Sequence, residues 1–198
     1  MNKNKNQIRR LLAAVCLAAA CCQGAQAFEV GGVKLDETAL IANKELKLNG
    51  AGLRYKAIFK VYAVGLYLPE KKSSVAEILA MPGPRRVAIV MLRDVSSDDF
   101  GQGFMTGLNN NSDKAEKTRI LNQTMQFGQM FALLPGLKKG DVLALDWIPG
   151  VGTQCQLNGK RIGEVMPELA FYNAVLKIWI GEKPVDHALK PKLLGEAG

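Results

Sequence analysis

An arginine and a tyrosine near the start of the chain's second quarter could together bind an anion. Arg54 belongs to the segment Leu48–Ala57, and Tyr62 belongs to the apolar segment Ile58–Leu68. Side chains alternate between the two faces of a strand, so residues 54 and 62 share one face if the segments pair as a hairpin. A turn centred on Ile58 would set them directly opposite, with β-carbons about 5 Å apart. The arginine fork matches a carboxylate, and the phenol adds one donor.

The surroundings of Arg54 predict an apolar trough. Gly50 and Gly52 lie on the same face of the strand, where a glycine often marks a bulge or the close approach of a ligand or another backbone. The second strand is apolar on both faces apart from Lys60, which predicts that both faces are covered. A structural role for Arg54 stays open, because most strand arginines are solvated or pair with an acid. Asp94 and Asp146 are the candidate partners.

Two motifs in this hairpin resemble the chalcone isomerase-like family. They are Gly-Ala-Gly-Leu-Arg at residues 50–54 and Lys-Val-Tyr-Ala-Val-Gly-Leu-Tyr-Leu at residues 60–68. The family's signature is a Gly-x-Gly-x-Arg strand followed by an apolar strand that ends in x-x-Gly-x-Tyr. The similarity continues through residues 138–163 and 171–195, so it covers nearly all of the chain after about residue 28. It implies an open-faced β-sandwich, with helices layered on a large sheet and the ligand between them.

The same resemblance bears on the choice between catalysis and binding. In the plant enzymes of the family an arginine stabilises the substrate's phenolate, helped by a threonine on the next strand and by a tyrosine and an asparagine on a helix. Arg54 matches the arginine, but Tyr62 stands at the threonine position, and Phe100 and Gly107 stand at the other two. Losing a positioned donor typically costs a few kcal/mol of transition-state stabilisation. The Arg/Tyr pair resembles the family's fatty-acid-binding branch, in which it holds the carboxylate.

The order of strand-like and helix-like segments predicts an α+β domain, with a large, mainly antiparallel sheet and helices layered on one face. The expected strands are a hairpin over Phe28–Leu35, then Leu48–Ala57, Ile58–Leu68, Arg85–Val95, Asp141–Ile148, Gly152–Leu157 and Arg161–Val165. The expected helices are Val75–Met81, one capped by Ser96, one capped by Asp113, Glu168–Ile180 and a short one opened by Pro184.

Two of these helices carry apolar stripes that could line a ligand site. In the first, Phe104 and Leu108 follow one another at helical spacing, and in the second Met125 and Phe127 lie on or beside the stripe. Such stripes are usually core. If they face the trough at Arg54, these four side chains would form an adaptable wall for an aliphatic tail.

The first 27 residues predict a secretory signal peptide. Basic residues precede the apolar run Leu11–Cys22, which is too short to span a membrane, and Ala25-Gln26-Ala27 is an A-x-A cleavage site. The mature domain would then be residues 28–198, periplasmic or secreted. A lipoprotein anchored at Cys21 is the less favoured alternative, because Ala18 stands where leucine is usual. Removing the leader lowers the formal net charge from +8 to +4, without the basic stripe expected of a nucleic-acid binder.

The sequence lacks the motifs of several enzyme classes. It contains no His/Cys/Asp cluster at metal spacing, no G-x-S-x-G elbow and no Walker sequence. We therefore expect no metal, no cofactor and no membrane span in the mature chain. The expected function is non-catalytic binding of a small amphipathic carboxylate, such as a fatty acid, by Arg54 and Tyr62. An isomerase (an intramolecular lyase of the chalcone type) that uses Arg54 to stabilise an oxyanion stays open as the alternative.

Overall fold

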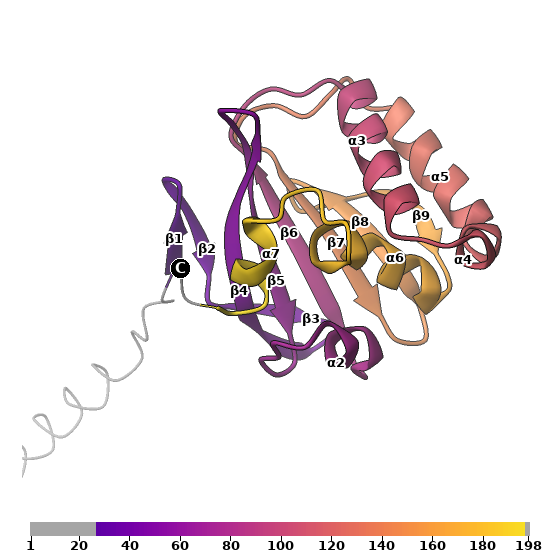
Figure 1. The fold of residues 1–198 in the computed structure, drawn as a ribbon, viewed down its shortest axis with the longest axis horizontal. Coiled ribbons are helices and arrows are strands. Elements are labelled where there is room, and N and C mark those ends of the chain that lie inside the picture. Colours follow the sequence, from indigo (N-terminus) through magenta and orange to yellow (C-terminus); the bar gives the residue numbers. More distant parts are fainter. Residues whose placement is uncertain (1–26, 197–198) are drawn as a thin grey trace, which may run out of the picture.

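The structure is a computed structural model that describes residues 27–196. Within this range, seven strands form one sheet in which every neighbouring pair is antiparallel and the order follows the chain (Figure 1). They are β3 (Thr38–Ile41), β4 (Lys44–Lys56), β5 (Phe59–Leu68), β6 (Arg85–Met91), β7 (Val142–Ile148), β8 (Gly152–Leu157) and β9 (Lys160–Met166). The expected signal peptide and the alternative anchor at Cys21 lie outside the described residues, apart from Ala27.

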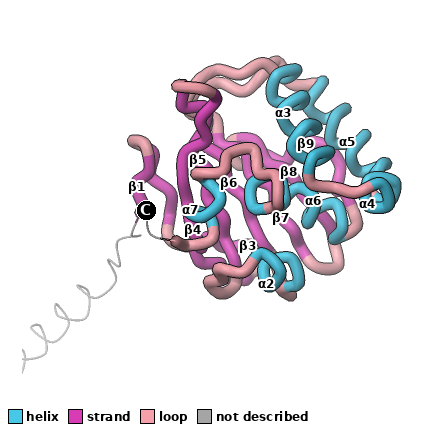
Figure 2. Tube along the Cα trace, viewed as in Figure 1, coloured by secondary structure: helices cyan, strands magenta, loops and turns pink. Residues whose placement is uncertain are grey.

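Helices cover one face of this sheet (Figure 2). They are α2 (Val75–Ala80), α3 (Ser97–Asn110), α4 (Lys114–Arg119), α5 (Leu121–Ala132), α6 (Leu169–Ile180) and α7 (Leu189–Leu193). Apolar side chains of α3, α5 and α6 pack on the inward residues of β5, β6 and β7, among them Val64, Ile89 and Leu145. Burial of this apolar surface is the main favourable contribution to folding. The α+β fold class predicted from the sequence is confirmed.

A small hairpin partly covers the opposite face. Strands β1 (Ala27–Val30) and β2 (Val33–Asp36) pair with each other, and Leu35 of the hairpin packs in a second apolar cluster with Leu48 and Tyr67 of the sheet. The Tyr67 hydroxyl also donates to the carbonyl oxygen of Asp36 at 2.9 Å. The apolar character of both faces of β5 is therefore matched by cover on both sides, as its sequence predicts.

The helix starts follow the predicted caps, but two boundaries differ from the prediction. The Oγ of Ser96 accepts from the N–H of Asp99 at 3.1 Å, and a carboxylate oxygen of Asp113 accepts from the N–H of Glu116 at 2.8 Å. The helix predicted after Asp113 is divided at Ile120 into α4 and α5. The final helix starts at Leu189 instead of Pro184, because the Asp186 side chain accepts from the N–H of Ala188 and holds that segment in a turn.

Two further differences concern strands. The short edge strand β3 was missing from the prediction, and β6 ends at Met91 instead of Val95. Beyond Met91 the chain leaves the sheet to reach α3, and Val95 pairs with Leu137 in an isolated bridge. No helix within residues 27–196 combines the length and apolar character that a membrane crossing requires.

Candidate functional site

The hairpin of β4 and β5 brings Arg54 opposite Tyr62, as the alternation of side chains predicts. The turn itself contains two residues, Ala57 and Ile58, which alone would pair position 54 with 61. One extra residue in β5 forms a bulge next to Arg54 and restores the pairing with Tyr62. Bulges of this kind re-aim side chains and are common next to binding sites. Here Val61 and Tyr62 both reach the same cavity.

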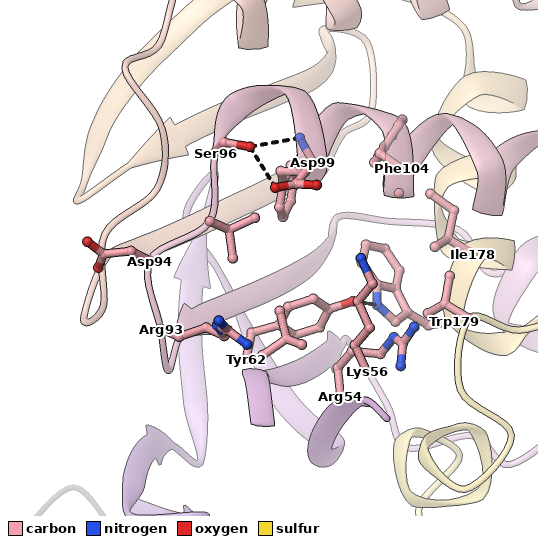
Figure 3. A pocket seen from close by; sticks show the side chains of 15 residues that line it. Arg54, Lys56, Tyr62, Arg93, Asp94, Ser96, Asp99, Phe104, Ile178 and Trp179 are labelled. Carbon is pink, nitrogen blue, oxygen red and sulfur yellow. Dashed lines mark hydrogen bonds between the residues drawn. The ribbon is translucent and has the colours of Figure 1, made fainter. Parts of the chain in front are cut away.

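A cavity of about 320 Å³ lies between this hairpin and the helices, close to the lower limit of small-molecule sites (Figure 3). Its walls come from four segments: Arg54, Lys56, Val61 and Tyr62 on the hairpin; Arg93, Asp94, Val95 and Ser96 after β6; Asp99, Phe100, Gly103 and Phe104 on α3; and Ile178, Trp179 and Val185 at the end of α6 and beyond it. Cationic and aromatic groups thus meet in one hollow.

Tyr62 is the buried polar group of the cavity. Its hydroxyl oxygen accepts from the indole Nε1–H of Trp179 at 2.9 Å, and the side chain is almost fully buried (Figure 3). Burial raises the pKa of Tyr62 to about 12, against the smaller opposing effects of the Trp179 hydrogen bond and the Arg54 charge. The phenol is therefore neutral at pH 7. Its oxygen is fixed by the indole, and its O–H can donate to a ligand oxygen.

Arg54 is half-buried beside Tyr62 and forms an ion pair with Asp186. Its Nη1 lies 3.7 Å from Oδ2 of Asp186, which is beyond hydrogen-bond distance. The Asp186 carboxylate is held in place by the N–H groups of Tyr55 and Ala188 at 3.1 and 3.0 Å. An ion pair of this length leaves the guanidinium N–H groups able to donate to a second anion in the cavity.

The acids considered as partners of Arg54 pair elsewhere. Asp94 accepts from the Lys138 ammonium at 3.2 Å and from the Lys139 N–H at 2.8 Å. The Asp146 carboxylate accepts hydrogen bonds from Nε and Nη2 of Arg86, both at 2.6 Å. The prediction of either as the partner was wrong, because the acid that reaches Arg54 comes from the irregular segment before α7.

Two further cations line the cavity. Lys56 has the same strand parity as Arg54, so the alternation that placed Arg54 in the trough also indicates Lys56. Arg93 follows β6 in a loop, and its Cζ lies 5.1 Å from the ring centre of Phe59. Side chains in a loop follow no periodic pattern, so the sequence does not predict that Arg93 lines the cavity. Within residues 27–196, no group of three or more His, Cys, Asp and Glu side chains is placed to hold a metal ion.

The four residues proposed as walls for a tail lie in different places. Phe104 lines the cavity and stacks on Phe127, with ring centres 3.8 Å apart. Phe127 and Leu108 are buried in the main core behind Phe104 and do not line the cavity. Met125 is 55% exposed and also does not line it. The helical stripe therefore predicts a buried face, but only its end nearest the hairpin reaches the cavity.

The glycines beside Arg54 mark the approach of another backbone. A β-carbon at Gly50 would overlap the carbonyl oxygen of Lys192 in α7, and one at Gly52 would lie 2.6 Å from a methyl group of Leu189. The space on this part of β4 is therefore occupied by α7. The trough remains open only toward the hairpin turn, where Arg54 lies.

Phe100 and Gly107, which match the helix tyrosine and asparagine of the plant enzymes, supply no side-chain hydrogen-bond donor. Phe100 lines the cavity but has no polar group. Gly107 lies on a different part of α3, where a β-carbon would meet Ile178 at 2.8 Å, so this glycine allows α3 and α6 to pack closely. The polar groups that line the cavity therefore come from the hairpin and from the segment 93–99.

The fold and the cavity together define an α+β protein in which a hollow lies between one antiparallel sheet and its helical layer. The family model described as chalcone isomerase-like matches residues 27–195, and the chain belongs to this family. Among solved structures it is similar to the crystal structure of a fatty-acid binding protein from Arabidopsis thaliana, with 16% identity and a TM-score of 0.66, covering 83% of this chain and 92% of that chain. That likeness shows the fold. No curated protein matched the sequence.

Proposed function

We propose that this protein binds a small amphipathic carboxylate, such as a fatty acid, without transforming it. The observation that carries the proposal is the placement of Arg54 and Tyr62 side by side in a cavity that also has apolar walls, among them Val61, Phe100 and Phe104. A planar guanidinium can hold both oxygens of a carboxylate, and such charge-assisted bonds are stronger than neutral ones. Tyr62 stays protonated because its pKa is raised to about 12, so it adds a neutral donor.

The volume of the cavity limits the part of the ligand that it encloses. At about 30 Å³ for each water molecule in the liquid, 320 Å³ corresponds to roughly ten small groups. A chain of about ten carbon atoms would therefore be enclosed, in contact with Val61, Phe100 and Phe104. Gly103 lines the cavity and is also exposed, so we expect a longer tail to leave the cavity there. The similar Arabidopsis structure is that of a fatty-acid binding protein, which supports the same ligand class.

A structural role for Arg54 is the second candidate, because the ion pair with Asp186 favours it. In that case, removing the arginine would lower stability and affect no ligand. The isomerase alternative has no comparable support, since Phe100 and Gly107 supply no donor for an oxyanion.

Native mass spectrometry of the protein purified from its own host separates these candidates. We expect an added mass equal to that of a carboxylic acid on the wild-type protein, and its loss in Arg54→Gln. Arg161→Gln is the matched control, because Arg161 is an exposed arginine on β9, in the strand at the far edge of the sheet from the hairpin. No adduct on the wild type, or the same adduct on Arg54→Gln, would contradict the proposal.

We also propose that the protein is periplasmic or secreted, with its first 27 residues removed. The A-x-A site before Phe28 supports this location. Determining the N-terminal residue of the protein from its host is the test. Phe28 is expected, whereas an acylated Cys21 would show the lipoprotein alternative and an intact Met1 would contradict both.

A further inference from the structure

The turn between β4 and β5 exposes large apolar side chains. Ile58 is 84% exposed and Phe59 is 56% exposed, and Tyr55 next to them is also exposed. The turn has two residues, and Ala57 has a φ of 55°, where such turns favour glycine. Ile58 is β-branched, a type that turns do not favour. The requirements of folding therefore do not explain these residues.

Cations surround this exposed tip. Lys56 and Lys60 flank the turn on its two strands, and the Arg93 guanidinium lies over the ring of Phe59. None of these three cations forms an ion pair with another residue of the described range 27–196. The nearby carboxylate of Asp94 is already compensated by Lys138 and the Lys139 N–H. The tip is thus apolar at its end and positively charged around it.

The tip is continuous with the entrance of the cavity. Lys56 and Arg93 belong to both, and the N–H of Leu92 donates to the carbonyl oxygen of Val61 at 3.0 Å, which ties the loop after β6 to the hairpin. In Figure 1 the hairpin turn and the loop from β6 to α3 lie together at one end of the molecule, while α2 lies at the other. A surface that receives the tip would therefore also face the cavity.

We propose that the β4–β5 tip docks on the surface of an anionic phospholipid bilayer. Ile58 and Phe59 enter the interface between head groups and acyl chains, and Lys56, Lys60 and Arg93 meet the lipid phosphates. Exposed apolar groups ringed by cations have the chemistry that anionic lipid surfaces attract. An amphipathic ligand then passes between bilayer and cavity without its tail crossing water. The docking itself requires no ligand, so it is independent of the proposed function.

Cosedimentation with vesicles tests this docking. We expect the protein to bind vesicles of POPC mixed with POPG and to bind pure POPC vesicles more weakly. Ile58→Ser should lower the partition coefficient about tenfold, as expected for loss of one buried aliphatic side chain. Lys60→Gln should lower it about fivefold on POPG vesicles only. Leu40→Ser is the matched control, because Leu40 is 70% exposed on β3, which pairs with the opposite end of β4.

The apolar segment Leu11–Cys22 could itself contribute to vesicle binding, but it is the same in all variants. Differences in binding between the variants therefore report on the substituted position. An Ile58→Trp variant adds a direct measurement: its emission should shift to shorter wavelength on POPG vesicles, whereas that of Leu40→Trp should not. Equal binding of Ile58→Ser and wild type, or no shift in Ile58→Trp, would overturn the proposal. The proposal would also be overturned if the wild-type protein were a dimer and Ile58→Ser dissociated that dimer without changing vesicle binding. Arg54→Gln should keep vesicle binding within twofold, which distinguishes failure of docking from failure of the ligand site.

Discussion

Filling the cavity at Gly103 should weaken ligand binding and at the same time stabilise the fold. Gly103 lies within α3 and lines the cavity, and a β-carbon there would meet no atom within 4 Å. A glycine inside a helix is about 1 kcal/mol less favourable than alanine, and leucine is nearly as favourable as alanine. Gly103→Leu should therefore raise the free energy of unfolding by about 0.8 kcal/mol, or the melting temperature by about 2–3 °C for a domain of this size.

The loss of affinity follows from the volume that the new side chain takes. Leucine adds four carbon atoms to a cavity that holds roughly ten small groups. If three or four methylenes of the ligand are displaced, each worth about 0.8 kcal/mol, binding loses about 2–3 kcal/mol. This is a weakening of about 30- to 150-fold. Gly103→Ala should stabilise the fold similarly and weaken binding much less.

Calorimetric titration with decanoate measures the affinity, and thermal unfolding measures the stability. Gly128→Leu is the matched control, since Gly128 is an exposed glycine within α5 whose added β-carbon would also meet nothing within 4 Å, and it does not line the cavity. It should show the same stabilisation with unchanged decanoate affinity. The reasoning is refuted if Gly103→Leu binds decanoate as tightly as wild type, or if Gly128→Leu loses affinity to the same extent.

Three further predictions concern the elements that frame the site. Gly50→Ala should destabilise the fold by about 1–3 kcal/mol in urea unfolding, because its methyl group would overlap the Lys192 carbonyl; an unchanged midpoint would speak against this packing. Stability should fall as pH rises from about 10 to 12, since the pKa of Tyr62 is about 12 when folded and about 10 when unfolded. Over that window Tyr62→Phe should lose about 2–3 kcal/mol less than wild type, and an equal loss would contradict the assignment. Asp186→Asn should raise decanoate affinity about fivefold in calorimetry, because it removes a negative charge beside Arg54, and an unchanged or lower affinity would argue against a carboxylate there.

Strand alternation was sufficient to predict that Arg54 and Tyr62 lie opposite each other in the hairpin. Arg54 and Tyr62 face each other because the two-residue turn and the bulge in β5 offset each other, so a turn centred on Ile58 gives the same register. The same parity indicates Lys56, which the prediction omitted. Arg93 and Asp186 lie in irregular segments, where spacing along the chain says nothing about direction in space.

Helix periodicity predicted which helix faces are buried, but not whether a buried side chain packs in the core or lines the cavity. Leu108 and Phe127 pack in the core, and Phe104 is the only one of the proposed wall residues that lines the cavity. The cavity adjoins only part of the helical layer, and the rest of the buried helix faces packs in the core. Gly50 illustrates the same limit. A glycine in a strand signals a close neighbour, and only the three-dimensional structure shows that this neighbour is the backbone of α7.

The central claim, that Arg54 holds a carboxylate, is tested most directly by comparing decanoate with decanol on the wild type and on Arg54→Gln. The two ligands share a tail and differ in the charged group. Hydrogen bonds to charged groups contribute about 1.5–3 kcal/mol, so Arg54→Gln should weaken decanoate binding about 10- to 150-fold and leave decanol binding unchanged. Equal affinity of the wild type for both ligands, or an equal loss for both in Arg54→Gln, would contradict the claim.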